Sequence, residues 1–532
     1  MLLSRTKEKI PWILLIFAIL IVNALYWCTR KEGYYIDELW SYGLSNSYYM
    51  PFLHQKENYM NNWHQPVFYE DYLMVRQNEA FSYDFVYDNQ VQDVHPPFYY
   101  ILLNTICSLF SNRFSKWFGL LVNLPFYCGS VFLLYKISGQ LLGKRKSVRF
   151  RPPFLYGLSM GAVSTLIYIR MYMLLTFWAL LFVFLVFYLI NEDAHKKRIL
   201  ILFATGLTIT AGFLTQYYFI IFLFFFSVAY VIWNMAAHQW RRAAEYLFTL
   251  CTGVAIGILI FPASLNHIFL GQQGRRAFIN AANGIHLFLK HWSRYRDTVL
   301  SEFFGNGHIK QFLLLFVFLI IIFAAMFSVK KKNQKICIWD TVPKAECLML
   351  LTAVCGYFSV IVQISPEVVD RYQFIIYPFC VLITVAVEVY LLRQLGKERV
   401  IWIITGLCLV FMVHTYMVKP VPYVYEGYQE VLDMLGTEYK NVPGIYVTAG
   451  DHLVINNCLF LAQQNMTYPL TAEQIDELPE ICKEMDTEQM ILYVDIYYDE
   501  QQTAERIAEL LEYRSYEILY DNTFTQIYLL SR

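Results

Sequence analysis

Long apolar segments alternate with short polar ones over the first 420 residues of the chain. Eleven of these segments approach the roughly 20 residues that a helix needs to span about 30 Å of hydrocarbon. The eleven segments are residues 10–29, 117–137, 153–169, 171–191, 199–215, 216–236, 246–269, 310–329, 345–364, 372–393 and 399–418. The pattern predicts a polytopic α-helical membrane protein with about eleven transmembrane helices, the first of which is retained rather than cleaved as a signal sequence.

Basic residues mark every second loop of this arrangement. The amino end contains Arg5, Lys7 and Lys9, and the later basic loops read KISGQLLGKRKSVRFR, EDAHKKR, HQWRR, KKKNQK and RQLGKER. Because Lys and Arg concentrate in short cytoplasmic loops, we expect a cell-membrane protein whose amino terminus is cytoplasmic. The long loops 30–116 and 270–309, together with everything after residue 419, are then extracytoplasmic.

One further segment, residues 96–110 in HPPFYYILLNTICSLF, is apolar enough to resemble a span. If it crossed the membrane, all the later basic loops would move outside. We therefore interpret it as an interfacial or re-entrant helix within the first outer loop, begun by the Pro pair at its amino terminus. A shortened true crossing is the alternative.

The composition changes after Pro420 and Pro422 to that of a water-soluble domain. Residues 444–449, 489–497 and 523–530 have the pattern of strands, and residues 503–513 have that of an amphipathic helix. We expect a transmembrane domain over residues 1–419 and a small extracytoplasmic α/β domain over residues 420–532.

The composition agrees with a membrane protein, since 57% of the residues are hydrophobic and only 16% are charged. Lys plus Arg and Asp plus Glu each number 42, so the net charge gives no support for a nucleic-acid partner. The lipid bilayer is the partner that the composition requires. The positions of the charges are then more informative than their sum.

Ionisable residues gather where the predicted outer loops meet the membrane. A charge beside hydrocarbon costs at least a few kcal/mol unless it is paired, so such positions tend to be functional. Four segments share this placement, and they are YYIDELWSY with Asp37 and Glu38, QDVHPPFYY with Asp93 and His95, IYIRMYMLL with Arg170 and Tyr172, and PEVVDRYQF with Asp370, Arg371 and Tyr372.

Each segment also has a purely structural interpretation. Asp37 and Glu38 fit a solvated acidic pair at a helix end, and His95 fits a hydrogen-bonded structural histidine. Arg170 can reach the aqueous interface by snorkelling, and Arg371 can be neutralised by its neighbour Asp370. The agreement of all four segments on one predicted membrane face favours a functional role.

Four motifs in these segments together resemble the glycosyltransferase C superfamily. They are DE after the first helix, HPP with an aromatic tail, RMY, and RY followed by Pro. Within this superfamily the pattern is similar to glycosyltransferase family 39, which includes dolichyl-phosphate-mannose protein mannosyltransferases and bacterial aminoarabinose transferases. The resemblance extends over about residues 10–393. Residues Tyr168 and Ile169 stand where relatives commonly have a carboxylate or an amide before the arginine, so sugar recognition at that turn is left open.

This resemblance implies an inverting transfer of one sugar from a polyprenyl-phosphate donor to a hydroxyl acceptor. Asp37 would be the base that accepts the proton of the attacking hydroxyl, and Glu38 would orient the acceptor or Asp37. The departing phosphate gains negative charge and needs fixed cations, which Arg170, Arg371 and His95 are placed to supply. Asp93, Tyr172 and Tyr372 complete the predicted substrate-binding set. The resembled mannosyltransferases need no metal, but Asp37, Asp93 and His95 are suitable ligands for a divalent cation, so the metal stays unassigned.

The 270–309 loop contains five basic residues on the predicted outer side, against the usual charge rule. They are Arg275, Arg276, Lys290, Arg294 and Arg296. A phosphate or anionic acceptor, contact with lipid headgroups, and simple tolerance of positive charge all explain them.

Other classes of protein share the polytopic pattern. A lipid or glycan transporter or flippase needs polar residues near the bilayer midplane, whereas we expect the ionisable groups here to lie at one face. A ligase or polymerase that moves whole glycans is chemically closer. An inactive membrane scaffold is the remaining alternative, and the presence of Asp37 argues against it.

Overall fold

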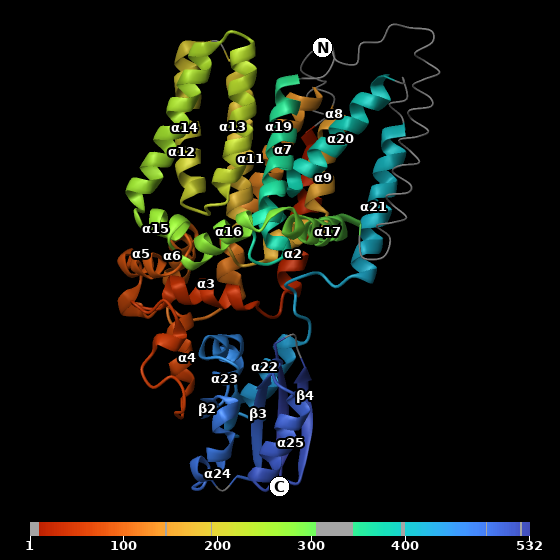
Figure 1. The fold of residues 1–532 in the computed structure, drawn as a ribbon. Coiled ribbons are helices and arrows are strands. Elements are labelled where there is room, and N and C mark those ends of the chain that lie inside the picture. Colours follow the sequence, from red (N-terminus) through yellow and green to blue (C-terminus); the bar gives the residue numbers. More distant parts are fainter. Residues whose placement is uncertain are drawn as a thin grey trace. The chain divides into compact units, whose positions relative to one another are not determined.

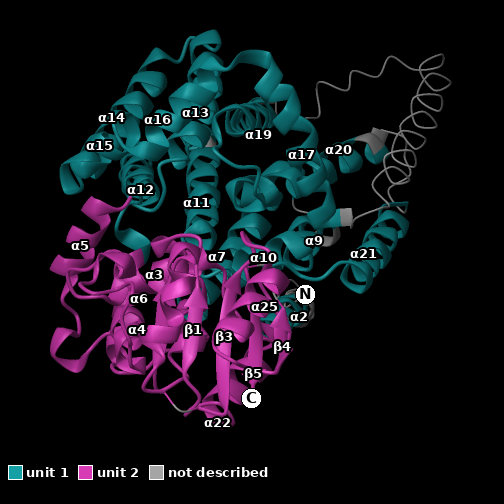
Figure 2. Cartoon of the chain, turned by 60° about the horizontal axis from the view of Figure 1, so that its bottom comes forward, with its two compact units in different colours: residues 1–28, 94–99, 120–422 teal, residues 29–93, 100–119, 423–532 magenta. Residues whose placement is uncertain are grey.

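The computed structural model describes residues 10–143, 146–192, 194–304, 344–394, 400–485, 487–521 and 524–532. Its internal contacts group the chain into two compact units, which are coloured separately in Figure 2. Unit 1 comprises Met1–Cys28, Val94–Tyr99 and Leu120–Pro422, and unit 2 comprises Thr29–Asp93, Tyr100–Gly119 and Tyr423–Arg532.

Unit 1 contains all or most of each long apolar helix. These helices are α2 (Ile10–Arg30), α7 (Lys116–Leu142), α11 (Tyr172–Asn191), α12 (His195–Phe213), α13 (Phe219–Ala236), α14 (Trp240–Ile260), α19 (Lys344–Ile364), α20 (Tyr377–Gln394) and α21 (Val400–Val418). Ten of the eleven predicted spans coincide with helical segments, and residues 310–329 lie outside the described part of the chain. Seven helical segments among the described residues are long and apolar enough to cross a membrane. A multi-pass membrane protein is confirmed, and the count of eleven stays a prediction.

The predicted span 153–169 is two short helices, α9 (Arg151–Gly157) and α10 (Met160–Ile167). Ser159 begins α10, because its hydroxyl accepts a hydrogen bond from the Ala162 amide at 3.2 Å. The same hydroxyl donates to the Tyr156 carbonyl at 2.6 Å, which satisfies one of the groups left open at the end of α9. These two hydrogen bonds therefore lower the cost of breaking the helix between α9 and α10.

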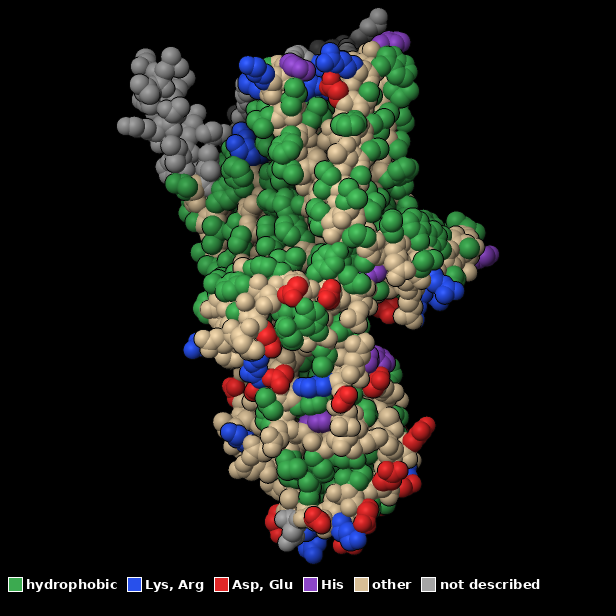
Figure 3. Space-filling view, turned by 90° about the vertical axis from the view of Figure 1, so that its left-hand side faces the viewer, with side chains coloured by type: hydrophobic (Ala, Val, Ile, Leu, Met, Phe, Trp, Pro, Cys, Tyr) green, Lys and Arg blue, Asp and Glu red, His purple; other side chains and the backbone are tan. Residues whose placement is uncertain are grey.

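Large apolar side chains cover the outside of the unit 1 helices (Figure 3). Leu200, Phe203, Phe248 and Leu259 are between 64% and 77% exposed, and they lie on α12 and α14. Exposed apolar area of this kind is far larger than soluble proteins tolerate. The lipid bilayer is its natural solvent.

The loops joining α11 to α12 and α13 to α14 lie at the same end of unit 1 (Figure 1). Lys and Arg side chains gather at this end (Figure 3), where Arg198 pairs with Glu245 at 2.8 Å. This clustering agrees with the predicted basic face, although the orientation of the termini stays a prediction.

Arg151, the last residue of the predicted basic loop KISGQLLGKRKSVRFR, is buried against its partners. Arg151 on α9 pairs with Glu388 on α20 at 2.6 Å, and Arg151 is only 2% exposed. The Arg151 Nε also donates to Thr405 on α21 at 2.6 Å. A buried arginine within the helices needs such partners, and the pair joins three helices.

Three helices occupy the predicted outer loop 270–309 and the residues before it. They are α15 (Ala263–Phe269), α16 (Gln272–Ala282) and α17 (Gly284–Phe304), and α16 and α17 run across the spans (Figure 1). Phe278, Ile279, Ile285 and Leu289 are each more than half exposed on these helices. The five basic residues of the segment are exposed as well. Exposed apolar and basic side chains on crosswise helices are typical of the membrane interface, which favours the headgroup explanation for these cations.

Unit 2 contains a five-stranded mixed sheet in the order β2-β1-β3-β5-β4. The strands are β1 (Gly444–Val447), β2 (Thr467–Leu470), β3 (Gln489–Asp495), β4 (Ser515–Asp521) and β5 (Thr525–Ser531). Strand β1 is parallel to β2 and β3, whereas β5 is antiparallel to β3 and β4. The three predicted strands are confirmed as β1, β3 and β5, and the predicted helix is α25 (Glu500–Leu510). The side of the membrane on which the sheet lies stays a prediction.

Buried aliphatic side chains form the core of this sheet. Val447, Leu492 and Val494 on the strands pack with Ala504 and Ile507 on α25, and all five are fully buried. Three more helices accompany the tail, and they are α22 (Tyr428–Thr437), α23 (Cys458–Leu461) and α24 (Leu478–Ile481).

The first outer loop is also helical. It contains α3 (Ile36–Asn46), α4 (Pro66–Leu73), α5 (Tyr83–Gln92) and α6 (Phe98–Leu109). Helix α6 begins directly after the Pro pair, as predicted, and its 12 residues extend about 18 Å. Asn104 of α6 donates to the Ser45 carbonyl of α3 at 2.8 Å. This length and packing support the interpretation as a helix of the loop rather than a crossing.

The first loop is bonded to the sheet of the tail within unit 2. His64 forms an isolated antiparallel bridge with Thr467 on β2, and the Tyr69 hydroxyl lies 2.8 Å from the Thr467 hydroxyl. The Tyr59 hydroxyl donates to the Asp451 carbonyl at 2.7 Å. Most of the loop, residues 30–93 and 100–116, therefore belongs to one compact unit with the residues after 422.

Candidate functional site

The predicted catalytic pair lies in the first turn of α3. Asp37 is 8% exposed and Glu38 is fully buried. The Glu38 carboxylate accepts a hydrogen bond from the Tyr35 amide at 2.7 Å, so it caps the helix on which it lies. Acidic residues at a helix amino terminus are also favoured by the helix dipole. The sequence thus folds here so that two adjacent carboxylates occupy one helix end.

Glu38 is paired with a lysine that the sequence analysis did not identify. Lys31 Nζ lies 2.9 Å from the Glu38 carboxylate, and both side chains are fully buried. Burial raises the pKa of the Tyr34 hydroxyl well above its usual value, and the nearby Glu38 charge raises it further. The signal that could have revealed Lys31 is its position seven residues before Glu38, just past the first apolar segment.

Asp93 and His95 belong to different units, although only Val94 separates them in the sequence. Asp93 is half-buried at the carboxyl end of α5 in unit 2. His95 belongs to unit 1, where its Nε2 lies 3.1 Å from the Arg170 Nη2. The structure thus joins two of the predicted substrate-binding residues, His95 and Arg170.

Arg170 lies in the tight turn between α10 and α11 and is only 4% exposed. Its amide donates to the Tyr168 carbonyl at 2.7 Å. The Asn123 side-chain amide donates to the Leu166 and Tyr168 carbonyls, both at 2.9 Å. These bonds satisfy the carbonyls at the end of α10 and fix the turn that presents the arginine.

Arg371 and Tyr372 lie in a 3₁₀ segment, η4 (Asp370–Ile376). The Arg371 guanidinium lies over the Tyr372 ring, 5.4 Å from its centroid. The Asp370 carboxylate accepts from the Arg371 amide at 2.7 Å, and the Tyr357 hydroxyl donates to the Tyr372 carbonyl at 2.6 Å. Arg371 is 8% exposed, so its charge is weakly screened by water.

The turn that contains Arg170 packs on the segment that contains Arg371. The Tyr172 ring lies edge-on to the Phe374 ring at 5.9 Å, and Tyr168 stacks on Tyr172 at 5.9 Å. Unit 1 therefore gathers His95, Arg170, Tyr172, Arg371 and Tyr372 on adjoining segments. Unit 2 contains Asp37, Glu38 and Asp93.

Glu302 on α17 is a buried carboxyl that the sequence analysis missed. It is 1% exposed, accepts from Ser164 at 3.1 Å and pairs with Lys419 at 2.8 Å. Burial raises the pKa of this carboxyl, and the Lys419 charge opposes the shift. The Asp370 charge raises this pKa further. The neighbouring Phe303 ring lies 5.2 Å from the ring of Tyr377, which directly follows the Arg371 segment. Its acidic position in the apolar run VLSEFF was the available signal.

Within the described residues, no cluster of three or more His, Cys, Asp or Glu is arranged to hold a metal ion. The metal therefore stays unassigned.

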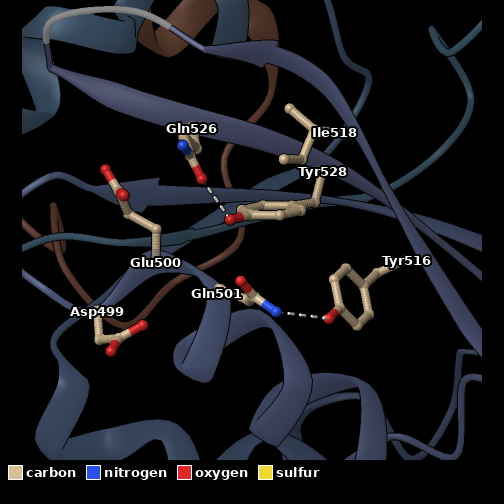
Figure 4. Close-up of a pocket in the computed structure, with 7 residues that line it drawn as sticks. All are labelled: Asp499, Glu500, Gln501, Tyr516, Ile518, Gln526 and Tyr528. Carbon is tan, nitrogen blue, oxygen red and sulfur yellow. Dashed lines mark hydrogen bonds between the residues drawn. The ribbon is translucent and has the colours of Figure 1, made fainter.

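A groove of about 540 Å³ lies at the amino end of α25 and the adjoining face of β4 and β5. Its lining includes Glu500, Gln501, Tyr516, Gln526 and Tyr528 (Figure 4). The Tyr528 hydroxyl donates to the side-chain oxygen Oε1 of Gln526, and the Gln501 side-chain amide donates to the Tyr516 hydroxyl at 3.5 Å. None of the predicted site residues lines this groove.

No protein-family model matches the sequence, and no curated protein matches it. The fold, however, is shared with solved protein structures. ArnT from Cupriavidus metallidurans, in a crystal structure with bound undecaprenyl phosphate, is similar over 98% of each chain, with a TM-score of 0.51 and 11% identity. Its apo structure gives a TM-score of 0.51 and 10% identity, again over 98% of each chain. The Archaeoglobus fulgidus oligosaccharyltransferase is also similar, with a TM-score of 0.48 and 12% identity over 96% of this chain and 72% of that one.

Proposed function

We propose that the chain is a membrane glycosyltransferase that moves one sugar from a polyprenyl-phosphate donor to a hydroxyl acceptor, with inversion at the anomeric carbon. The observation that supports this most directly is the pair of buried arginines, Arg170 and Arg371, on adjoining segments of a membrane-embedded unit. A planar guanidinium is well suited to phosphate. The similar fold of ArnT, which was crystallised with undecaprenyl phosphate, agrees with a phosphate-bearing lipid.

The proposed reaction is a single displacement, in which one bond to the anomeric carbon forms as another breaks. The acceptor oxygen forms a bond to the anomeric carbon while its proton passes to the Asp37 carboxylate. The bond from the anomeric carbon to the phosphate oxygen breaks, and its electron pair leaves with the polyprenyl phosphate. Arg170, Arg371 and His95 stabilise the added charge, and Tyr172 and Tyr372 shape the headgroup site beside them. Asp93 contacts the sugar or the acceptor.

Glu38 has a supporting part in this proposal. Its carboxylate is occupied by Lys31 and by the Tyr35 amide, which fits a residue that orients Asp37. Because adjacent helical residues point about 100° apart, Asp37 projects in a different direction from Glu38.

Transfer of labelled sugar from synthetic polyprenyl-phosphate monosaccharides by the purified chain in nanodiscs tests the proposal. A panel of donors is incubated with the delipidated cell-surface fraction of a strain that lacks the protein, and the product's anomeric configuration is read by NMR. We expect one donor to be consumed with inversion, and undecaprenyl phosphate to compete with it. Absence of transfer from every donor, with no binding of undecaprenyl phosphate, would refute the proposed function.

A further inference from the structure

The segment that leads from the first span to α3 is bonded to the beginning of the tail. The Glu32 amide donates to the Val424 carbonyl at 2.8 Å, and the Glu32 carboxylate accepts from the Gly427 amide at 2.7 Å. Arg30 pairs with Glu426 at 2.6 Å. Residues 30–33 and 423–427 thus run together within unit 2.

The two segments approach so closely that only glycine fits at position 33. A Cβ there would lie 2.7 Å from the Tyr425 Cβ and from a Tyr428 ring carbon. On the tail side, Tyr423 and Tyr425 have φ of 68° and 57°, a left-handed conformation that bulky residues rarely adopt. Such backbone persists only where the surroundings hold it, so this contact is a strongly determined part of the fold.

Lys31 lies at the centre of this contact. Besides the Glu38 carboxylate, its ammonium donates to the Tyr423 carbonyl at 2.8 Å. The rings of Tyr34 and Tyr425 lie 5.5 Å and 5.8 Å from the same ammonium. One fully buried cation therefore bonds the tail, the connecting segment and the first turn of α3.

We propose that Lys31 is a positioning residue for the transfer reaction, because its buried contacts with Glu38 and the Tyr423 carbonyl fix the α3 turn that presents Asp37. This inference rests on the proposed function and extends it to the tail. The residues after 422 then contribute to catalysis by holding the helix of the base, without supplying a reacting group.

A purely structural ion pair would affect stability but not the chemical step, so the variants separate the two. Lys31→Met alone would leave a buried carboxylate unpaired, which is strongly destabilising. The main variant is therefore Lys31→Met combined with Glu38→Gln, which removes both buried charges. Lys31→Arg keeps the positive charge and tests whether that charge restores the rate. Arg506→Met with Asp476→Asn is the matched control, because that pair in unit 2 is exposed on both sides.

The full-length chain in nanodiscs is assayed for kcat, KM and undecaprenyl phosphate binding, and hydrogen exchange is measured over residues 34–46. We expect the main variant to lose about 10²-fold in kcat, the scale of a small misplacement of a catalytic group, with phosphate binding retained. Exchange should quicken in the first turn of α3, Lys31→Arg should recover part of the rate, and the control pair should behave as wild type.

Wild-type kcat in the well-folded main variant would overturn the proposal, and so would unchanged exchange in the first α3 turn. The exchange measurement does not depend on activity. If the wild-type chain itself transfers no sugar, the proposed function fails, whereas faster exchange in the main variant would still show that the Lys31–Glu38 pair fixes this helix.

Discussion

Replacing Arg371 by alanine tests the proposed phosphate site most directly. The guanidinium is only 8% exposed, so neither water nor salt can substitute for it easily. A hydrogen bond to a charged group contributes about 1.5–3 kcal/mol. Since about 1.4 kcal/mol corresponds to a factor of ten in rate, we expect kcat/KM to fall by about 10- to 150-fold. Arg371→Lys should fall between the two, because it keeps the charge and loses the planar fork.

The assay compares sugar transfer and undecaprenyl phosphate binding in detergent for the two variants and a matched control. Arg393→Ala is the control, because Arg393 lies at the other end of α20, where it donates to the Leu142 carbonyl at 2.9 Å. Thermal unfolding of each variant checks that the fold is retained. If Arg371→Ala folds normally and keeps kcat/KM at the level of Arg393→Ala, the assignment of Arg371 to the phosphate is wrong.

Three further predictions follow from other parts of the chain. Asp37→Asn should lower kcat by about 10²- to 10⁴-fold with donor binding intact, because an amide cannot accept the proton; turnover at the wild-type rate would exclude Asp37 as the base. Impermeant thiol reagents should label a cysteine introduced at Glu57 or Glu473 from outside and one at Lys197 only after permeabilisation, and the opposite pattern would invert the predicted topology. Burial raises the pKa of Asp495, so the folded state binds its proton more tightly than the unfolded state. The stability of the wild type relative to Asp495→Asn should therefore decrease as the pH rises from about 4 to about 7, and a pH-independent difference between their unfolding midpoints would contradict this.

The long apolar segments were predictable because each helix must satisfy its own backbone inside lipid. The same argument could not locate the break at Ser159, since it depends on one hydroxyl bonding to both neighbouring turns. Nor could it show α16 and α17. Their apolar residues recur at helical spacing among polar ones, a period that a search for continuous apolar segments does not detect.

The sequence motifs identified charged residues at one predicted face but not their partners. His95 and Arg170 meet although 75 residues separate them, which no local pattern specifies. Glu38 illustrates the same limit, because its carboxylate serves Lys31 and the Tyr35 amide within a buried network. The adjacent positions in the sequence predicted a pair of acids. The structure distinguishes the two side chains, since Asp37 is 8% exposed and Glu38 is fully buried.

In the tail, strands β1, β3 and β5 were predictable because their apolar residues alternate with polar ones or form continuous runs. Strands β2 and β4 were not predictable in this way. Strand β2 has only four residues and includes Pro469, a residue usually confined to sheet edges. Strand β4 exposes most of its side chains, so it lacks an apolar period.

The bridge between His64 and Thr467 has a consequence for the order in which the protein is made. The Tyr69 and Thr467 hydroxyls that accompany this bridge are 398 residues apart. At roughly 5–20 residues per second, ribosomes need about 20 to 80 s to synthesise such a length. During that interval the first loop has emerged without the strand it will cover, and all the intervening spans are inserted first. The first loop of unit 2 can therefore reach its final structure only after β2 has been synthesised, which makes its completion a late step in biogenesis.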